Sequence, residues 1–197
     1  AKILSNVVAS QKIHAEYGGV VPELASRAHQ SNIVPVVHQA LKEANITKTQ
    51  INGIAFTRGP GLMGSLLVGT SFAKSLAYGL EIPLIDVNHM QGHILAHFIE
   101  ESSHKKPPFP FLAMTISGGH TQIVRVDGYF KMTVIGETID DALGETFDKV
   151  AQMLGLNYPG GPEIEKLALN SKRIRFPLPR PLIDQKNHQI QTVQLHN

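Results

Sequence analysis

The sequence predicts an α/β protein in which helices pack on a mixed sheet. Short runs rich in β-branched residues alternate along the chain with longer segments whose apolar residues recur at helical spacing. In the second half, two predicted strands are separated only by Asp127-Gly128, a dipeptide typical of hairpin turns. Alternating strands and helices, together with directly joined strands, indicate a layered α/β domain with a mixed sheet.

Six segments have the length and composition of strands, and each is bounded by residues that favour turns. They are residues 2–10, 51–57, 83–87, 111–116, 122–126 and 129–138. Between 83–87 and 111–116 the chain includes a proline-containing loop over residues 102–110. The strands are therefore spread over most of the chain.

The helices begin and end at residues that favour helix termini. Pro22 suits the first turn of one helix, and Asp140 can cap another. Gly79 and Gly155 are expected to end two helices. Pro35 should kink or split the first helix, because proline lacks a backbone donor. The predicted helical segments are residues 22–44, 47–50, 62–78, 89–101, 140–154 and a segment opened by Pro162.

Composition excludes several classes of protein. The 197 residues are 42% hydrophobic, which is enough for one domain or two small ones. No apolar run approaches the roughly 18 residues that a membrane span needs. Without cysteine, any metal must be held by imidazole and carboxylate groups. The formal charge of +2 does not by itself indicate a nucleic-acid partner, and the basic cluster of residues 172–186 suits a solvated loop.

Two histidines, His89 and His93, directly follow a predicted strand. Residues four apart on a helix share one face, so the two imidazoles can converge on a metal ion; the alternative is a pair of ordinary surface histidines. A zinc protease would carry glutamate as its general base after the first histidine, but Met90 and Gln91 stand there. His97, a further turn along, is expected to be structural or solvent-facing.

Three segments of the second half fit a nucleotide site. Ser117-Gly118-Gly119-His120-Thr121 lies between two predicted strands, where paired glycines let the backbone approach a ligand and flanking hydroxyls can donate to phosphate oxygens. It lacks the Gly-Lys-Ser/Thr of a Walker loop, and such a segment also makes ordinary turns. Asp148 could reach ribose hydroxyls, and Gly160-Gly161 could admit an adenine ring. Taken singly, Asp148 also fits an exposed or ion-paired carboxylate, and the glycines fit a loop.

The combination of these motifs, in this order, is the most specific signal in the chain. The motifs are Gly19–His29, Gly59-Pro60-Gly61-Leu62, His89–His93, Ser117–Thr121, Phe147-Asp148-Lys149 and Tyr158–Pro162. Together they closely resemble TsaD, the tRNA threonylcarbamoyltransferase family once known as O-sialoglycoprotein endopeptidase or glycoprotease. The resemblance runs from Ala1 to about Asp184.

The resemblance implies an actin-like, sugar-kinase-like ATPase (ASKHA) fold. It implies transfer of a threonylcarbamoyl group from threonylcarbamoyl-AMP to N6 of the adenosine beside the anticodon in tRNA. It also implies that His89 and His93 bind one Fe²⁺ or Zn²⁺ ion, which acts as a Lewis acid. The substrate-binding positions that it implies are Thr115, Ile116, Ser117, Gly118, Gly119, Asp148, Gly161 and Glu165.

The resemblance also implies partners: tRNA, a paralogous TsaB-like subunit, a TsaE-like ATPase and a second copy of the chain, which would dimerise through a helical surface such as residues 62–78. It implies no membrane, and a cytoplasmic location, or a mitochondrial one for a eukaryotic organellar homologue. Two alternatives remain. A metal-dependent endopeptidase is disfavoured by Met90, and a non-catalytic partner subunit should lack the metal histidines.

The chain also departs from the family pattern. By the resemblance, we expect family members to have a first strand that lies ahead of the position of Ala1, and a further lobe that carries an aspartate metal ligand and follows the matching segment. We therefore expect residues 1–184 to form the first lobe of the fold, incomplete relative to the full two-lobe protein, and residues 185–197 to be a non-matching tail.

Overall fold

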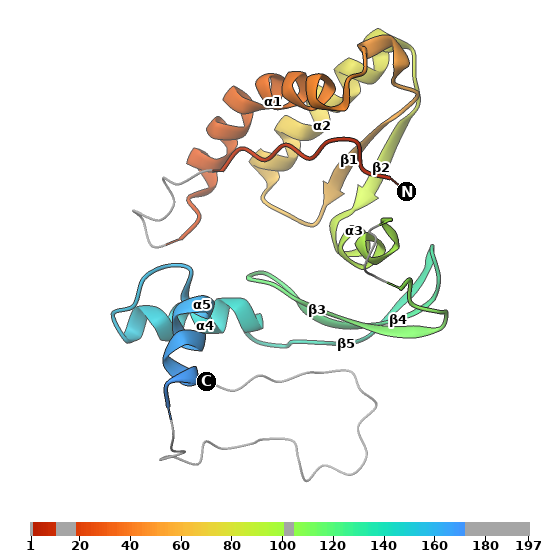
Figure 1. Ribbon diagram of the computed structural model, residues 1–197. Coiled ribbons are helices and arrows are strands. Elements are labelled where there is room, and N and C mark those ends of the chain that lie inside the picture. Colours follow the sequence, from red (N-terminus) through yellow and green to blue (C-terminus); the bar gives the residue numbers. More distant parts are fainter. Residues whose placement is uncertain (1, 11–18, 101–104, 172–197) are drawn as a thin grey trace. The chain divides into compact units, whose positions relative to one another are not determined.

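The computed structural model describes residues 2–10, 19–100 and 105–171. The chain divides into two compact units, Ala1–Pro107 and Pro108–Asn197 (Figure 1). This boundary falls in the segment predicted as a proline-containing loop, and the single lobe expected over residues 1–184 stays a prediction. The predicted basic cluster and the 185–197 tail lie outside the described residues. Among those residues, no helix is both long and apolar enough to cross a membrane.

The α/β class is as predicted, but the mixed sheet is not. In the part of the chain that the structure describes, the strands form two separate sheets, one parallel and one antiparallel. The reason lies in the connections. A helix between two strands allows the parallel pairing, whereas hairpins in the second unit give only antiparallel neighbours.

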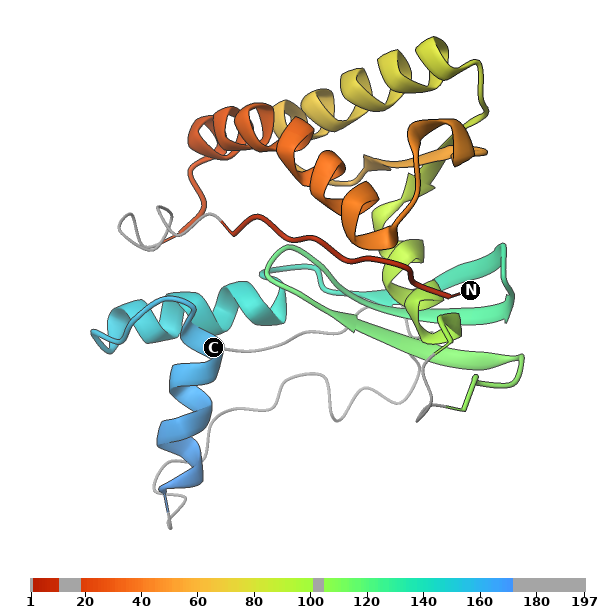
Figure 2. The ribbon, with the colours of Figure 1, turned by 45° about the horizontal axis from the view of Figure 1, so that its top comes forward.

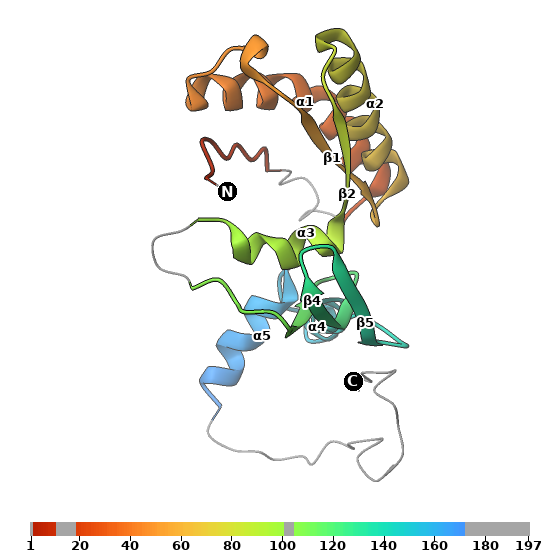
Figure 3. The ribbon, with the colours of Figure 1, turned by 90° about the vertical axis from the view of Figure 1, so that its right-hand side faces the viewer.

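The first unit packs two long helices on a parallel strand pair. Figure 3 shows α1 and α2 side by side, and α2 also packs on β1. The buried residues of both helices are alanines, and a Cβ at Gly64 of α2 would collide with Ser26 of α1, so the helices approach closely. The elements are α1 (Pro22–Ala44), η2 (Lys48–Gln50), β1 (Ile54–Gly59), α2 (Met63–Leu80), β2 (Leu84–Asn88), α3 (His89–Leu95) and η3 (Ala96–Phe98).

Residues 2–10 do not form the predicted strand. The segment is held to α1 by a hydrogen bond from Ser5 Oγ to the Ala40 carbonyl at 2.8 Å, and residues 7–9 line a mostly apolar cavity of about 650 Å³ against α1, β1 and α2. A segment of β-forming residues becomes a strand only when a neighbouring strand pairs with it.

Two helix ends differ from the prediction, and the first helix, which has its predicted bounds, is not split. The first helix continues through Pro35 without a break, because a proline removes only one backbone bond from a long helix. Gly79 lies inside α2, which ends at Leu80 and is followed by its C-cap, Glu81, in the left-handed conformation, with φ 55°. The helix expected over residues 89–101 is shorter: α3 ends at Leu95 and a 3₁₀ turn follows. The capping-box turn at Lys48–Gln50 is confirmed.

The second unit is an antiparallel sheet with two helices. Its elements are β3 (Phe111–Ile116), β4 (Thr121–Gly128), β5 (Lys131–Glu137), α4 (Leu143–Met153) and α5 (Gly160–Leu169). The hairpin between β4 and β5 closes at the pair Gly128 and Lys131, so its turn is Tyr129-Phe130, two residues beyond the predicted Asp127-Gly128 turn. Gly155 follows the end of α4 with φ 70°, as predicted, but Asp140 does not cap this helix; its carboxylate accepts a hydrogen bond from Thr138 Oγ1.

Helix α5 starts in direct contact with α4 and runs away from it at a steep angle (Figure 2). Gly160, the first residue of α5, is buried, and a Cβ there would lie 2.6 Å from the Phe147 carbonyl oxygen and 2.9 Å from Asp148 Cα. Glycine therefore sets how closely the two helices approach.

We expect Gly160→Ala to lower the free energy of unfolding by about 1–3 kcal/mol, because the added methyl group meets backbone that can yield only if the helices separate. Urea denaturation followed by circular dichroism measures the change. Gly79→Ala is the matched control. That helical glycine has nothing within 4 Å of its Cβ position, so alanine there should be neutral or stabilising by up to about 1 kcal/mol. A Gly160→Ala variant as stable as the unaltered chain would contradict the packing described.

Candidate functional site

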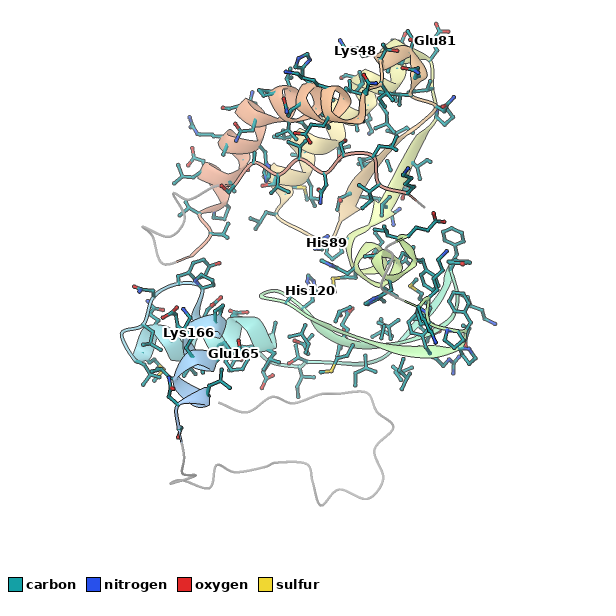
Figure 4. The ribbon with its side chains drawn as sticks, viewed as in Figure 1. Lys48, Glu81, His89, His120, Glu165 and Lys166 are labelled. Carbon is teal, nitrogen blue, oxygen red and sulfur yellow. The ribbon has the colours of Figure 1, made fainter. Side chains whose placement is uncertain are left out.

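The helix that carries the paired histidines is anchored at its first turn. Asn88 Oδ1 accepts the backbone N–H groups of Met90 at 3.0 Å and Gln91 at 3.1 Å, so the helix starts directly after β2. Figure 4 shows His89 at this start. Met90 is buried, whereas His89 and His93 are exposed. Their Nε2 atoms lie 3.1 Å apart, with the rings edge to face.

This pair fits two ligands of one metal ion. With metal–nitrogen bonds of about 2.0–2.1 Å, the nitrogen–metal–nitrogen angle at an ion bonded to both Nε2 atoms would be roughly 100°, which suits tetrahedral and octahedral centres. Within the described segments, no group of three or more His, Cys, Asp or Glu side chains could hold a metal.

In the second unit, residues Ser117–His120 form the turn between β3 and β4, which we call the glycine loop. Ser117 N–H donates to the His120 carbonyl at 2.9 Å, and Ser117 Oγ accepts the His120 N–H at 3.0 Å. The serine hydroxyl predicted to face a phosphate is thus engaged within the loop. Gly118 and Gly119 are exposed, with nothing within 4 Å of their Cβ positions, so it is their backbone that a ligand can approach.

The glycine loop lies against the first turn of α4. Gly144 N–H donates to the Ser117 carbonyl at 3.2 Å, and Leu143 N–H donates to Thr121 Oγ1 at 2.9 Å. Thr121 is only 1% exposed, so its hydroxyl serves the helix and not a ligand. The positive end of the helix dipole lies beside the loop, which favours an anion there.

Two predicted contacts belong to the strand before the loop. The Thr115 hydroxyl is buried, with no hydrogen-bond partner among the described residues, whereas Ile116 is 53% exposed. Neither side chain offers a polar group at the surface.

The predicted nucleoside contacts gather where α4 meets α5. Asp148 is half-buried in α4, and its Oδ1 accepts the Gly160 N–H at 2.7 Å. Gly161 follows with open space at its Cβ position. Glu165, labelled in Figure 4, is exposed four residues further along α5, a spacing that puts it on the same helix face as Gly161.

A cluster of three charged side chains at the start of α4 was not predicted from the sequence. Lys149 Nζ contacts Asp141 Oδ2 at 2.6 Å and Glu145 Oε1 at 3.1 Å. These contacts raise the pKa of Lys149, chiefly through the hydrogen bond to Asp141 and next through that to Glu145. The i,i+4 spacing of Glu145 and Lys149 was visible in the sequence, but Asp141 lies eight residues away in a loop.

The predicted site residues therefore form two groups, one in each unit. His89 and His93 belong to the first unit. The strand end, the glycine loop and the α4–α5 junction belong to the second. In both groups, predicted site residues lie at or near the start of a helix: α3 in the first unit, and α4 and α5 in the second.

Comparison with known proteins assigns the chain to a family. The family model described as TsaD, tRNA N6-adenosine threonylcarbamoyltransferase, matches residues 2–194. The chain therefore belongs to the TsaD family, whose fold is actin-like. The match continues past Asp184, where the resemblance was expected to end, and a separate tail over residues 185–197 stays a prediction.

Curated relatives carry the same description. One from Christiangramia forsetii is 72% identical over 186 residues, which are 94% of this chain and 55% of that protein. One from Riemerella anatipestifer is 61% identical over 93% of this chain and 54% of its own length. The chain spans about half the length of the curated relatives it matches. A solved structure, YeaZ from Pseudomonas aeruginosa, aligns with a TM-score of 0.39 and 21% identity over 54% of this chain and 49% of that one.

The pKa of Lys149 is open to measurement. We expect its NMR titration midpoint to lie above that in the urea-unfolded chain, and Asp141→Asn to lower it. Because the folded pKa is raised, the contact contributes stability that is present below the ordinary lysine pKa of about 10.4 and is lost as pH rises through the folded value. As pH rises through that range, the free energy of unfolding of the Asp141→Asn variant should therefore fall less than that of the unaltered chain. An Asp141→Asn chain with an unchanged Lys149 titration would contradict the assignment.

Proposed function

We propose that this chain is part of an enzyme that transfers the threonylcarbamoyl group of threonylcarbamoyl-AMP to N6 of the adenosine beside the anticodon in tRNA. The observation that carries the proposal is the 72% identity, over 94% of this chain, to a tRNA N6-adenosine threonylcarbamoyltransferase. The paired histidines and the exposed glycine loop supply residue types that the reaction needs.

The roles of the residues follow from their positions. The backbone of Gly118 and Gly119 is accessible to the phosphate of the adenylate, and the first turn of α4 lies behind it. Asp148 has one oxygen engaged with Gly160, which leaves the other for ribose hydroxyls. Gly161 leaves room for the base, and Glu165 offers an exposed carboxylate one turn further on.

In the reaction, N6 of the tRNA adenosine forms a C–N bond to the carbonyl carbon, N6 loses a proton, and the bond to the adenylate phosphate breaks, releasing AMP. An Fe²⁺ or Zn²⁺ ion held by His89 and His93 would supply a Lewis acid for the carbonyl oxygen. The two imidazoles would hold such an ion, and the backbone of the glycine loop binds the phosphate of the leaving AMP.

The proposal extends to partners and location. We propose tRNA as substrate, a TsaB-like subunit and a TsaE-like ATPase as partners, and the cytoplasm as location. Met63 is 72% exposed and Leu67 56% exposed on α2, which supports this helix as a surface for a partner subunit or a second copy. An endopeptidase is not supported, since Met90 beside His89 is buried and carries no base.

The test joins the chain to the part of the Christiangramia forsetii relative that it does not cover. We expect the fused protein, given tRNA, threonylcarbamoyl-AMP and the partner proteins, to form the modified adenosine detected by mass spectrometry. Replacement of His89 by alanine should lower the rate by at least about tenfold. A fused protein that folds but makes no product, while the intact relative is active, would contradict the proposal.

Metal binding gives a separate prediction. We expect the chain to bind Co²⁺ or Zn²⁺ more weakly than a full-length relative, because two neutral imidazoles leave much of the ion's charge uncompensated. His93→Ala should weaken binding by about tenfold or more, and His97→Ala, one turn further along, should leave it unchanged. Calorimetric titration measures both. Tight binding that survives His93→Ala would place the metal elsewhere.

A further inference from the structure

We infer that Thr121 and Gly144 are positioning residues that fix the orientation of the glycine loop on α4, so that Gly118 and Gly119 meet the substrate phosphate in one arrangement. The inference rests on the proposed function for the role of the loop. It adds two residues, neither of them a predicted substrate contact. Both act through the loop and not on the substrate itself.

Thr121 stands in for the cap that α4 lacks. The N-cap position is Ala142, whose methyl group cannot accept a hydrogen bond from the first turn. Thr121 Oγ1, 22 residues away in the sequence, accepts the Leu143 N–H instead. The Thr121 carbonyl also accepts the Thr138 N–H at 3.0 Å. One buried residue thus joins the end of the glycine loop to both ends of the segment between β5 and α4.

Gly144 makes the second contact between the helix and the loop. Its N–H donates to the Ser117 carbonyl. A Cβ at this position would lie 2.7 Å from the Ser117 carbonyl oxygen and 2.8 Å from the Gly118 nitrogen, distances that real Cβ atoms do not adopt. Any larger residue would push the glycine loop away from the helix.

The hydrogen bonds that Leu143 and Gly144 of α4 donate set the orientation of the glycine loop on the helix, whereas the hydrogen bonds inside the loop do not. The hydrogen bonds between Ser117 and His120 set the shape of the turn, but they lie within it. Gly118 and Gly119 have no side chains to hold them, and open space surrounds both Cβ positions. Their direction relative to α4 is therefore set through Thr121 and Gly144.

The experiment compares two probes, AMP and adenosine, which differ only in the phosphate. NMR titration of the full chain gives the affinity for each. We expect Thr121→Val, which keeps the shape but loses the hydroxyl, to weaken AMP binding by about tenfold and adenosine binding by less than about twofold. Thr121→Ser, which keeps the hydroxyl, should leave AMP affinity within about threefold of that of the unaltered chain. Gly144→Ala should weaken AMP binding as Thr121→Val does. Gly79→Ala is the control.

The result is decisive in either direction. Equal losses for AMP and adenosine, or an unchanged AMP affinity in both Thr121→Val and Gly144→Ala, would overturn the inference, as would no AMP binding by the unaltered chain. If Thr121→Val does not fold, Gly144→Ala and the Thr121→Ser variant decide. The proposed function is judged separately, by formation of modified adenosine in the fused protein, so the two can fail independently.

Discussion

The first N–H groups of a helix have no partner inside it, and the candidate site residues are positioned by the acceptors that serve those groups. Three helix starts show this. Asn88 accepts two N–H groups of α3, the helix that carries the histidine pair. Thr121 and the Ser117 carbonyl serve α4, and Asp148 serves α5. Each cap also fixes where a strand, loop or neighbouring helix meets the helix, and that is where the predicted ligand contacts lie.

Only part of this arrangement could be predicted from the sequence. The histidine pair was found because its i,i+4 spacing is a local signal, and β3 was predicted with its observed bounds because its apolar run is clearly bounded. The caps from Thr121 and Asp148 were not predicted, since each acceptor is distant in sequence from the helix that it serves. Asp140 looked like the cap of α4 and is not: the helix starts at Leu143 with Ala142 at the N-cap, and Thr121 Oγ1 accepts the Leu143 N–H.

The errors share one physical cause. Residues 2–10 have the composition of a strand, yet pairing depends on a neighbour that local sequence does not encode. The two sheets have different strand directions because their connections differ, and composition alone could not show that they were separate. The close contacts of two glycines with neighbouring backbone also depend on residues distant in the sequence. Gly144 and Gly160 look like ordinary glycines, but each admits backbone where a methyl group would not fit.

The caps on α4 and α5 have a consequence for exchange with solvent. Amide hydrogens at helix starts ordinarily exchange quickly, because terminal turns fray. Here the Leu143 amide is bonded to a hydroxyl of a nearly inaccessible threonine, and the Gly160 amide to a carboxylate of the preceding helix. Deuterium uptake at these two positions would thus follow the opening of the contacts between elements and not the fraying of helix ends, so two single amides report on whether the second unit is intact.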